Sequence, residues 1–318
     1  MGPRLVKTLV IGAAGMIGRK LVQALPREEL ILQDVVPFDG GLVSDLSAPG
    51  EAEKLVWGRP GVIFHLAAVV SGEAEADFDK GYRVNLEGTQ RLFEAIRKQK
   101  DYRPRVVFTS SIAVFGAPFP EAIGDEFLAA PLTSYGTQKA IGELMLADYT
   151  RRGFFDGIAI RLPTICVRPG KPNQAASGFF SGIIREPLAG EEAVLPVPDT
   201  VRHWFASPRA AVGFLIHAAH IDTAQLGARR SLNMPGVSAT VAEQIEALRK
   251  VAGEKAVQRI RRAPDATIMR IVEGWPRNFD ARRALALGFR ADSSFEEIIR
   301  IHIAEELQGI PAPRPGCA

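Results

Sequence analysis

Residues 8–25, TLVIGAAGMIGRKLVQAL, decide the fold of this chain. The stretch begins with a short apolar run that is typical of a buried strand and ends in a helical pattern. Between the two, Gly12, Gly15 and Gly18 follow a G-x-x-G-x-x-G spacing. Glycines at this position let the backbone turn tightly and approach a pyrophosphate at the start of the helix. The stretch therefore predicts a dinucleotide-binding β–α unit.

An acidic residue stands at the distance from this loop that such a unit needs. Asp34 follows Gly18 by sixteen residues and ends a second apolar run. A carboxylate there accepts hydrogen bonds from the adenosine ribose and repels a 2′-phosphate, so the pattern favours NAD over NADP. Asp45 and Leu46 would then approach the adenine ring. The alternative interpretation of Asp34 is an ordinary strand-end aspartate.

Strand and helix patterns alternate through the first half of the chain. Apolar runs at 61–69, 105–116 and 157–167 predict strands, and residues 79–99 and 134–153 predict helices. Strands that alternate with helices form a parallel sheet with helices on both faces. We expect an α/β fold, a doubly wound (Rossmann) parallel sheet with a smaller, mainly helical substrate lobe.

The pattern changes after the last of these strands, which suggests two lobes. We expect an NAD-binding domain over residues 1–167, with segments at about 208–235 returning to its sheet. The substrate-binding lobe would combine residues 168–207 and 236–310, followed by a flexible tail over 311–318.

Bulk composition excludes several classes of protein. A net charge of +3 over 318 residues is too weak to indicate nucleic acid or an anionic membrane as partner. No apolar run is long enough to cross a bilayer, and we expect no signal peptide. Cys166 lies in an apolar stretch and Cys317 near the end, so no disulfide framework is expected and a cytoplasmic location fits.

Three residues predict the chemistry. Tyr135 and Lys139, in SYGTQKA, lie one helical turn apart, so both side chains rise from the same helix face. Ser111 ends a predicted strand, where functional groups of a parallel sheet gather. The phenolate of Tyr135 would remove a substrate hydroxyl proton while hydride leaves the same carbon. Lys139 would lower the pKa of the tyrosine, and Ser111 would place the substrate oxygen.

These motifs together resemble a known family. GAAGMIG, Asp34, HLAA at 65–68, Asn85 in NLEGT, FTSSIAVFG and YGTQK are similar to the extended short-chain dehydrogenase/reductase family, in its NAD-dependent epimerase/dehydratase branch. The resemblance implies catalytic roles for Ser111, Tyr135 and Lys139. It also implies a set of residues that contact NAD: Gly12, Gly15, Met16, Ile17, Gly18, Asp34, Asp45, Leu46, Leu66, Ala67, Ala68, Asn85, Ser110, Tyr135, Lys139 and Pro163.

Further stretches resemble family members that oxidise the 2-hydroxyl of a four-carbon sugar acid with NAD. These are HLAAVVSGEAEADFD, SYGTQKAIGEL, RLPTICVRPGKPN and GIIREPLAGEEAV. A sugar acid needs a cation for its carboxylate, and arginine suits bidentate capture. The candidate substrate-binding residues are Ser71, Ser111, Arg168, Asn173, Ser177, Arg185 and Arg202.

Two alternative functions remain open from the sequence. A nucleotide-sugar 4-epimerase would use the same three catalytic residues, and a redox-sensing protein would bind NAD without chemistry. Ile112 and Ala113 stand where the sugar-nucleotide dehydratases of the family carry Asp-Glu, which argues against dehydration. HWFASPRA at 203–210 replaces the stretch common in nucleotide-sugar enzymes.

Other polar residues receive structural interpretations. His65 starts an apolar strand segment and is expected to be a packed residue rather than an acid or base, and Asp125 and Glu126 are expected to shape their loop. The histidines form no metal-ligand cluster, so we predict no metal. The resemblance implies a homodimer through a four-helix bundle built from the helices at 79–99 and 134–153. Their wide apolar surface (Leu86, Leu92, Phe93, Ile96, Leu144, Met145, Leu146) could equally pack against the sheet.

Overall fold

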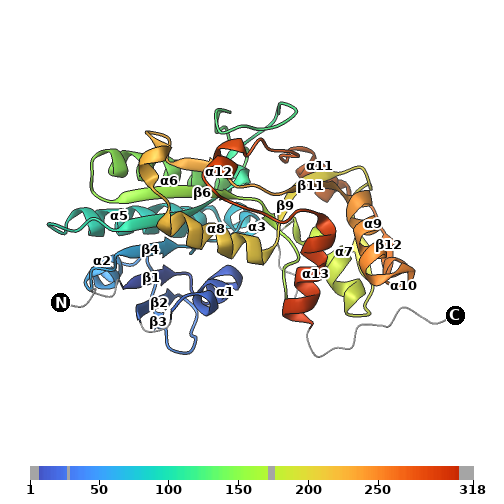
Figure 1. Ribbon diagram of the computed structural model, residues 1–318, viewed down its shortest axis with the longest axis horizontal. Helices are drawn as coiled ribbons and strands as arrows, with labels where there is room; N and C mark the ends of the chain where they lie inside the picture. The colour runs from blue at the N-terminus through green and yellow to red at the C-terminus, as the bar shows by residue number, and fades with distance from the viewer. Residues whose placement is uncertain (1–6, 27–28, 171–175, 308–318) are drawn as a thin grey trace.

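The computed structural model describes residues 7–26, 29–170 and 176–307. Its centre is a seven-stranded sheet in the order β10-β6-β5-β4-β1-β2-β3, and every described pairing in it is parallel (Figure 1). The strands are β1 (Thr8–Ile11), β2 (Leu30–Asp34), β3 (Leu42–Val43), β4 (Val62–His65), β5 (Arg105–Ser111), β6 (Asp156–Leu162) and β10 (Ser231–Asn233). The predicted doubly wound parallel sheet is confirmed.

Helices cover both faces because alternate residues of each strand point to opposite sides. On one face, Val10 and Ile160 pack with residues of α1 (Met16–Ala24) and α8 (Pro208–His220). On the other, Leu9 and Phe108 pack with residues from the helices that follow β3, β4 and β5. The helices of this core are α2 (Glu51–Val56), α5 (Gly88–Arg97) and α6 (Ser134–Arg151). Between β4 and α5 the chain also forms α3 (Ser71–Ala76), α4 (Phe78–Gly81) and the π-helix η2 (Tyr82–Glu87).

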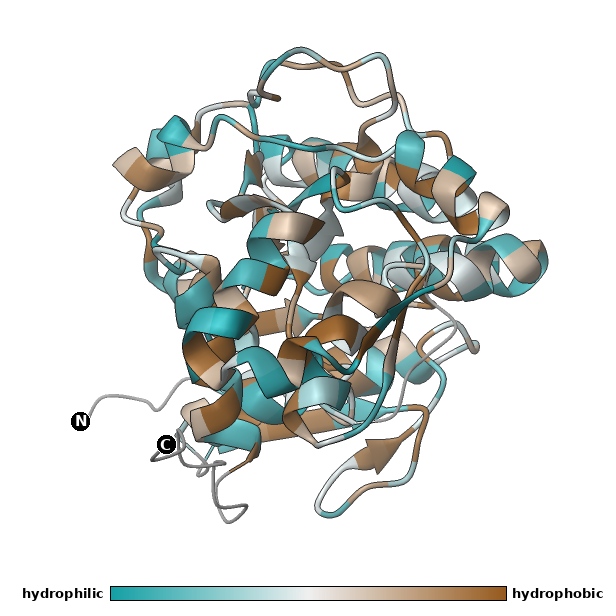
Figure 2. Cartoon of the chain, turned by 90° about the vertical axis from the view of Figure 1, so that its right-hand side faces the viewer, coloured by the Kyte–Doolittle hydropathy of each residue, from teal (hydrophilic) through white to brown (hydrophobic). Residues whose placement is uncertain are grey.

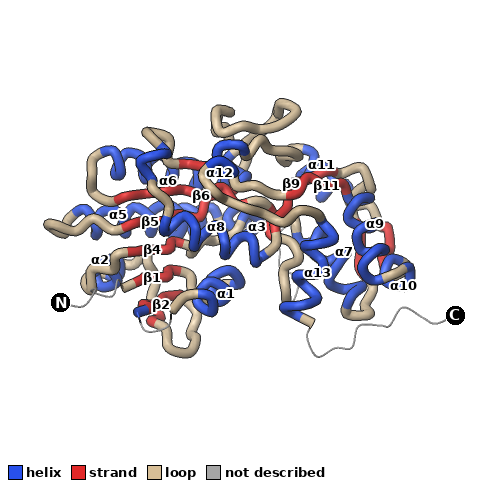
Figure 3. Tube along the Cα trace, viewed as in Figure 1, coloured by secondary structure: helices blue, strands red, loops and turns tan. Residues whose placement is uncertain are grey.

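The second half builds a smaller lobe beside the carboxyl ends of the strands, and this lobe is mostly helical (Figure 3). Its core joins aromatic and aliphatic residues such as Phe180, Phe205 and Leu248. The lobe contains α7 (Gly178–Leu188), α9 (Val241–Ala252), α10 (Glu254–Val257), α11 (Ala266–Glu273) and α13 (Phe295–Glu306), with β7 (Thr164–Ile165), β8 (Ala193–Leu195), β9 (Arg202–Ala206), β11 (Val237–Thr240) and β12 (Ile260–Arg262). Hydrophilic and hydrophobic residues alternate along the helices of this side, as expected for amphipathic packing (Figure 2).

One part of the chain differs from the predicted division into lobes. Residues 236–310 were assigned to the substrate lobe, but Ala284 of α12 (Arg282–Ala286) and Phe289 belong to the core between the sheet and α8. The His217 side chain of α8 also hydrogen-bonds to the Leu287 carbonyl, at 2.8 Å. The chain therefore crosses back to the sheet before α13 returns to the lobe.

Ion pairs connect the last helix of the lobe to the sheet helices. Glu305 of α13 accepts from Lys20 of α1 at 2.9 Å and from Arg209 of α8 at 2.7 Å, and Glu306 also pairs with Lys20. The other side of α13 packs in the lobe core through Ile298. This helix therefore joins the two parts of the molecule.

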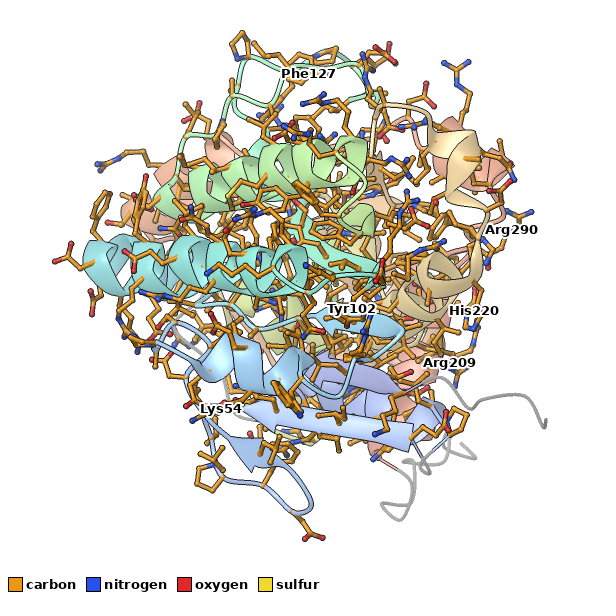
Figure 4. The ribbon with its side chains drawn as sticks, turned by 90° about the vertical axis from the view of Figure 1, so that its left-hand side faces the viewer. Lys54, Tyr102, Phe127, Arg209, His220 and Arg290 are labelled. Carbon is orange, nitrogen blue, oxygen red and sulfur yellow. The ribbon has the colours of Figure 1, made fainter. Side chains whose placement is uncertain are left out.

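The short 3-10 turns η3 (Ile112–Val114) and η4 (Thr223–Leu226) complete the described elements. After η3 the chain forms a long projecting loop that carries Phe127 and leads into α6 (Figure 4). Phe115 and Phe127 pack with Trp204 and Phe279 of the second half, so the base of this loop is anchored in a small apolar cluster.

Candidate active site

The glycine loop lies where β1 meets α1, and its glycines are required by close backbone contacts. Gly12 has φ +89°, and a Cβ on it would lie 2.6 Å from the Ala67 backbone nitrogen. A Cβ on Gly18 would lie 2.1 Å from the Gly12 carbonyl oxygen. No side chain caps the start of α1. The first turn of the helix, which contains Met16 and Ile17, therefore has backbone N–H groups that no capping side chain occupies.

Asp34 holds this loop in place and ends β2 beside it. One carboxylate oxygen accepts from the Ala14 N–H at 2.9 Å and the other from the Val36 N–H at 3.2 Å. Each oxygen has a further lone pair with which it can accept from a ribose hydroxyl. The carboxylate is nearly buried, at 9% exposure, so a phosphate beside it would meet an unscreened negative charge. These features fit the predicted NAD site.

The segment after β4 forms the opposite side of the loop. The N–H groups of Leu66 and Ala67 both donate to the Ile11 carbonyl, at 2.9 and 3.0 Å. Asn85 holds the next residues: its amide bonds both the N–H and the C=O of Val69, at 2.8 and 2.9 Å. It also donates to Gln138 at 2.7 Å. Asn85 thus fixes the loop that contains Ala68, and both of its amide hydrogens already have protein partners.

Other predicted cofactor contacts also have partners within the protein. The Asp45 carboxylate accepts from the N–H and hydroxyl of Ser47, and pairs with Arg83 at 2.7 Å. Leu46 is buried in the core beside α2. Pro163 is buried between β6 and β7. Ser110 donates to Glu143 at 2.5 Å.

Tyr135 and Ser111 lie together at the carboxyl end of β5. The side-chain oxygen of Thr133 caps α6 by accepting from the Gly136 N–H at 3.1 Å, which places Tyr135 in the first turn. Gly136 allows this turn to lie directly on η3, because a Cβ on it would lie 2.1 Å from the Ala113 carbonyl oxygen. Burial raises the pKa of Tyr135, and its hydrogen bond with Ser111 and the positive charge of Arg168 act in the opposite direction.

Lys139 lies one turn further along α6 and is buried. Its ammonium donates to the Thr109 carbonyl at 2.8 Å and lies 5.8 Å from the centre of the Tyr135 ring. Burial lowers the pKa of Lys139 to about 7, against the opposing effect of the Glu143 carboxylate. Ser111, Tyr135 and Lys139 therefore meet at the end of β5, as the predicted chemistry requires.

The predicted substrate-binding residues divide into two groups. Arg168 is close enough to Tyr135 to act on its pKa, and its guanidinium donates to Ser177 at 3.1 Å and to the Ile165 carbonyl at 3.2 Å. Arg185 supports it from α7, through a hydrogen bond of 2.8 Å to the Arg168 carbonyl. Ser71 begins α3, on the segment that follows the Asn85-held loop.

Arg202 and Asn173 do not join this group. Arg202 begins β9, where it donates to Ser238 and pairs with Glu243 at 3.2 Å on the surface of the lobe. Asn173 lies outside the described residues.

His65 and His203 have protein partners that suit structural roles. The Thr89 hydroxyl donates to the Asn85 carbonyl, so the Nε2–H of His65 donates to that hydroxyl, at 2.8 Å. Burial lowers the pKa of His65 to about 3, which keeps the ring neutral. His203 stacks on Phe180 at 5.2 Å between ring centres. Within the described part of the chain, no group of three or more His, Cys, Asp or Glu side chains is arranged to hold a metal.

A buried ionic network beside the catalytic residues was missed by the sequence analysis. Glu143 forms a two-pronged ion pair with Arg161 of β6, at 2.7 and 2.9 Å, and accepts from Ser110. Arg161 continues to Asn233 at 3.2 Å, whose N–H donates to Asp125 at 2.7 Å. One signal was available: Glu143 follows Lys139 by four residues, which places both on one helix face. The pairing with Arg161 depends on the neighbouring strand and has no local signature.

The sheet, the glycine loop and the Ser-Tyr-Lys group define the class of protein. Residues 8–226 match the NAD dependent epimerase/dehydratase family, and the chain belongs to this family. It is 46% identical to a D-erythronate dehydrogenase of Cupriavidus necator, over 94% of this chain and 98% of that one. It is 41% identical to a D-erythronate dehydrogenase of Haemophilus influenzae, over 95% of this chain and all of the other.

A solved structure is also similar. The crystal structure of a nucleoside-diphosphate-sugar epimerase from Agrobacterium tumefaciens is 64% identical, with a TM-score of 0.90 over 97% of this chain and 98% of that one. The family's NAD dependence agrees with the cofactor predicted from Asp34, and the cradle formed at Gly12 and Gly18 fits it. No helix in the described ranges is both long and apolar enough to span a membrane.

Proposed function

We propose that the protein is an NAD-dependent dehydrogenase that oxidises the 2-hydroxyl of D-erythronate to give 2-dehydro-D-erythronate. Two relatives with the name D-erythronate dehydrogenase align with nearly the whole chain, which supports this substrate. The structural observation that carries the proposal is Arg168, a cation beside Tyr135. A substrate with a carboxylate next to the reacting hydroxyl needs a positive charge at that place.

The roles of the catalytic residues follow from their geometry. Tyr135 takes the proton of the substrate hydroxyl, and Ser111, its hydrogen-bond partner, holds the hydroxyl oxygen. Lys139 supplies a positive charge 5.8 Å from the Tyr135 ring, which favours the phenolate. When bound, NAD supplies the acceptor for the hydride from the same carbon.

Arg168 is the best of the three arginine candidates for the carboxylate. Its guanidinium is held by two neutral acceptors, Ser177 and the Ile165 carbonyl, and it makes no ion pair with a carboxylate of the described residues. Arg185 pairs with Glu186, and Arg202 with Glu243. A partly buried cation without a carboxylate partner costs free energy in the absence of substrate, and a bound carboxylate offsets that cost.

For the cofactor, we assign the pyrophosphate to the glycine loop and first turn of α1, and the adenosine ribose to Asp34. Leu66, Ala67 and Ala68 would line the opposite wall. Asn85 and Ser110 act by holding this wall and the end of β5, because their side chains already have partners.

A nucleotide-sugar epimerase is the second candidate, since the similar structure from Agrobacterium tumefaciens carries that name. Three side chains of the HWFASPRA stretch argue against it. His203, Trp204 and Phe205 are buried: the rings of His203 and Phe205 contact each other, and Trp204 contacts Phe279. None of the three is therefore exposed to stack on a nucleotide base.

We also propose a cytoplasmic homodimer through α5 and α6, which lie side by side on one face (Figure 4). Leu144 is 73% exposed on α6 and Phe78 is 55% exposed on α4, before η2 and α5. Leu92, Phe93, Ile96 and Leu146 pack against the sheet and contribute nothing to such an interface. Light scattering should give the mass of a dimer for the wild-type protein. A Leu144→Glu variant should shift the measured mass toward that of a monomer.

The test of function is NADH formation with NAD or NADP, against D-erythronate, related sugar acids and one UDP-sugar. NADH growth with D-erythronate and NAD supports the proposal. Conversion of the UDP-sugar to its epimer, with no NADH from any acid, would overturn it in favour of the epimerase.

A further inference from the structure

We propose that Glu143 is a positioning residue for the reaction: fixed by Arg161 and Ser110, it keeps Lys139 charged beside Tyr135 and holds the end of β5 against α6. The inference rests on the proposed dehydrogenase activity. It concerns a group that touches neither substrate nor cofactor and acts through Lys139.

The geometry places Glu143 on the same helix face as both catalytic side chains. It lies one turn beyond Lys139 and two turns beyond Tyr135 on α6. Its side chain is buried, and so are those of Lys139 and Arg161. In a buried environment a carboxylate one helical turn away strongly stabilises an ammonium. Tyr135 lies about twice as far from Glu143 along the helix as Lys139 does, so the carboxylate acts less on the tyrosine.

The partners of Glu143 fix both α6 and β5. Ser110, which donates to it at 2.5 Å, is the residue next to Ser111. Thr109, on the other side of Ser110, accepts from Lys139 at 2.8 Å. Arg161 of β6 binds both carboxylate oxygens, and the Phe115 ring lies 4.8 Å from the Arg161 guanidinium carbon. The carboxylate therefore connects the strand end that carries Ser111 to the helix that carries Tyr135.

The charged and titratable groups around Lys139 come from several elements. On α6 these are Tyr135 and Glu143, and on β4 the neutral His65. Beyond Glu143, Arg161 lies on β6, with Asp125 at the far end of the network. Arg168 faces Tyr135 from the segment after β7. Glu143 is the negative group that faces Lys139 among these.

The chemistry needs one particular proton arrangement of the pair. After one proton is lost, the remaining one lies either on Lys139, with Tyr135 as phenolate, or on Tyr135, with Lys139 neutral. Only the first arrangement can accept the substrate proton at Tyr135. Burial favours the second, and Glu143 favours the first because it is nearer to the ammonium.

The test is the pH profile of kcat for Glu143→Gln, which keeps an acceptor for Ser110 and removes the charge. We expect the plateau of kcat to fall about tenfold or more and the acid limb to move about one pH unit lower, since the fully protonated pair loses its proton more readily. KM for D-erythronate should change little. Glu143→Asp, which retains the charge, should keep the acid limb near its wild-type position.

Control variants separate the loss of the Glu143 charge from a general loss of structure. Asp148→Asn removes an exposed carboxylate from the same helix, where it pairs with Arg151, and should leave both kcat and the pH profile unchanged. If Glu143→Gln does not fold because it leaves Arg161 unpaired, the double variant Glu143→Gln/Arg161→Met removes both charges and should show the same direction of shift. A folded variant with the wild-type acid limb and plateau overturns the proposal.

A second readout separates this inference from the proposed function. NADH affinity, followed by protein fluorescence between acid and alkaline pH, reports the charge of Lys139 without turnover. Its apparent pKa should be lower in Glu143→Gln than in wild type. Absence of activity with D-erythronate in wild type, together with this shift, would contradict only the substrate, while an unchanged binding profile would contradict the role of Glu143.

Discussion

The two sides of the site are built in different ways. The cofactor side is held by contacts to the backbone: Gly12 lies against the Ala67 backbone, Gly18 lies against the Gly12 carbonyl, and the Asp34 carboxylate accepts from the Ala14 N–H. The substrate side joins side chains from separate parts of the chain, with Tyr135 from α6 and Arg168 from the second half. Backbone geometry tolerates few residue types, whereas a side-chain assembly changes with each replacement.

The largest effect is expected on the substrate side, from Tyr135→Phe. Loss of the phenol removes the group that takes the hydroxyl proton, so kcat should fall about 10²–10⁴-fold. NADH affinity, measured by fluorescence titration, should stay within about twofold because the glycine loop is untouched. A Tyr135→Phe enzyme with full activity would remove the mechanism.

Arg168→Met should have the next largest effect. A charge-assisted bond to a carboxylate contributes about 1.5–3 kcal/mol, so kcat/KM for D-erythronate should fall roughly 10–150-fold, mainly through KM. Arg249→Met, which removes a surface arginine paired with Glu246 and Glu254, is the matched control. If Arg202→Met raised KM more than Arg168→Met, the carboxylate would have to be placed at the start of β9 instead.

On the cofactor side, Asp34→Asn should change specificity more than rate. It retains an oxygen that can accept from the Ala14 N–H and removes the charge that opposes a 2′-phosphate. The ratio of kcat/KM for NAD to that for NADP should fall about tenfold. As a control, Asp39→Asn alters an exposed carboxylate in the loop between β2 and β3 and should leave the NAD/NADP ratio unchanged. An unchanged ratio in Asp34→Asn would place the discrimination elsewhere.

The last predicted effect concerns stability and not catalysis, in Lys139→Met. Burial lowers the folded-state pKa of Lys139 to about 7, while that of the unfolded chain is about 10.4. Between these values the unfolded state binds the extra proton, so this group makes stability rise with pH. The variant lacks the buried ammonium, so it should melt a few degrees higher near pH 6–7, on the order of 2 kcal/mol. The difference in melting temperature between the variant and wild type should disappear toward pH 10. A difference that does not depend on pH would contradict the buried charge.

The same contrast explains how much could be predicted. The doubly wound sheet, the glycine loop and the meeting of Ser111 with Tyr135 and Lys139 depend on local patterns, and the structure has all of them. The buried pair of Glu143 and Arg161 was missed because it joins a helix to a strand eighteen residues away. Periodicity reports that a residue is on a buried face and does not report its partner.

Two further features show the same limit. The wide apolar surface of the predicted helices was compatible with a dimer interface or with packing against the sheet, and Leu92 and Leu146 are fully buried within one chain. Arg202 was chosen by its position before an aromatic segment, but its partners Ser238 and Glu243 come from β11 and α9. In both cases the deciding contacts come from elements far away in the sequence.

The attachment of α13 makes the molecule sensitive to its solvent at one place. Glu305 and Glu306 of this helix meet Lys20 and Arg209 in partly exposed ion pairs. Added salt screens such pairs, while it leaves the apolar packing of α13 in the lobe intact. Higher ionic strength should therefore weaken the contact of α13 with α1 and α8 slightly, and with it one of the links between the lobe that carries Arg168 and the helix that begins at the glycine loop.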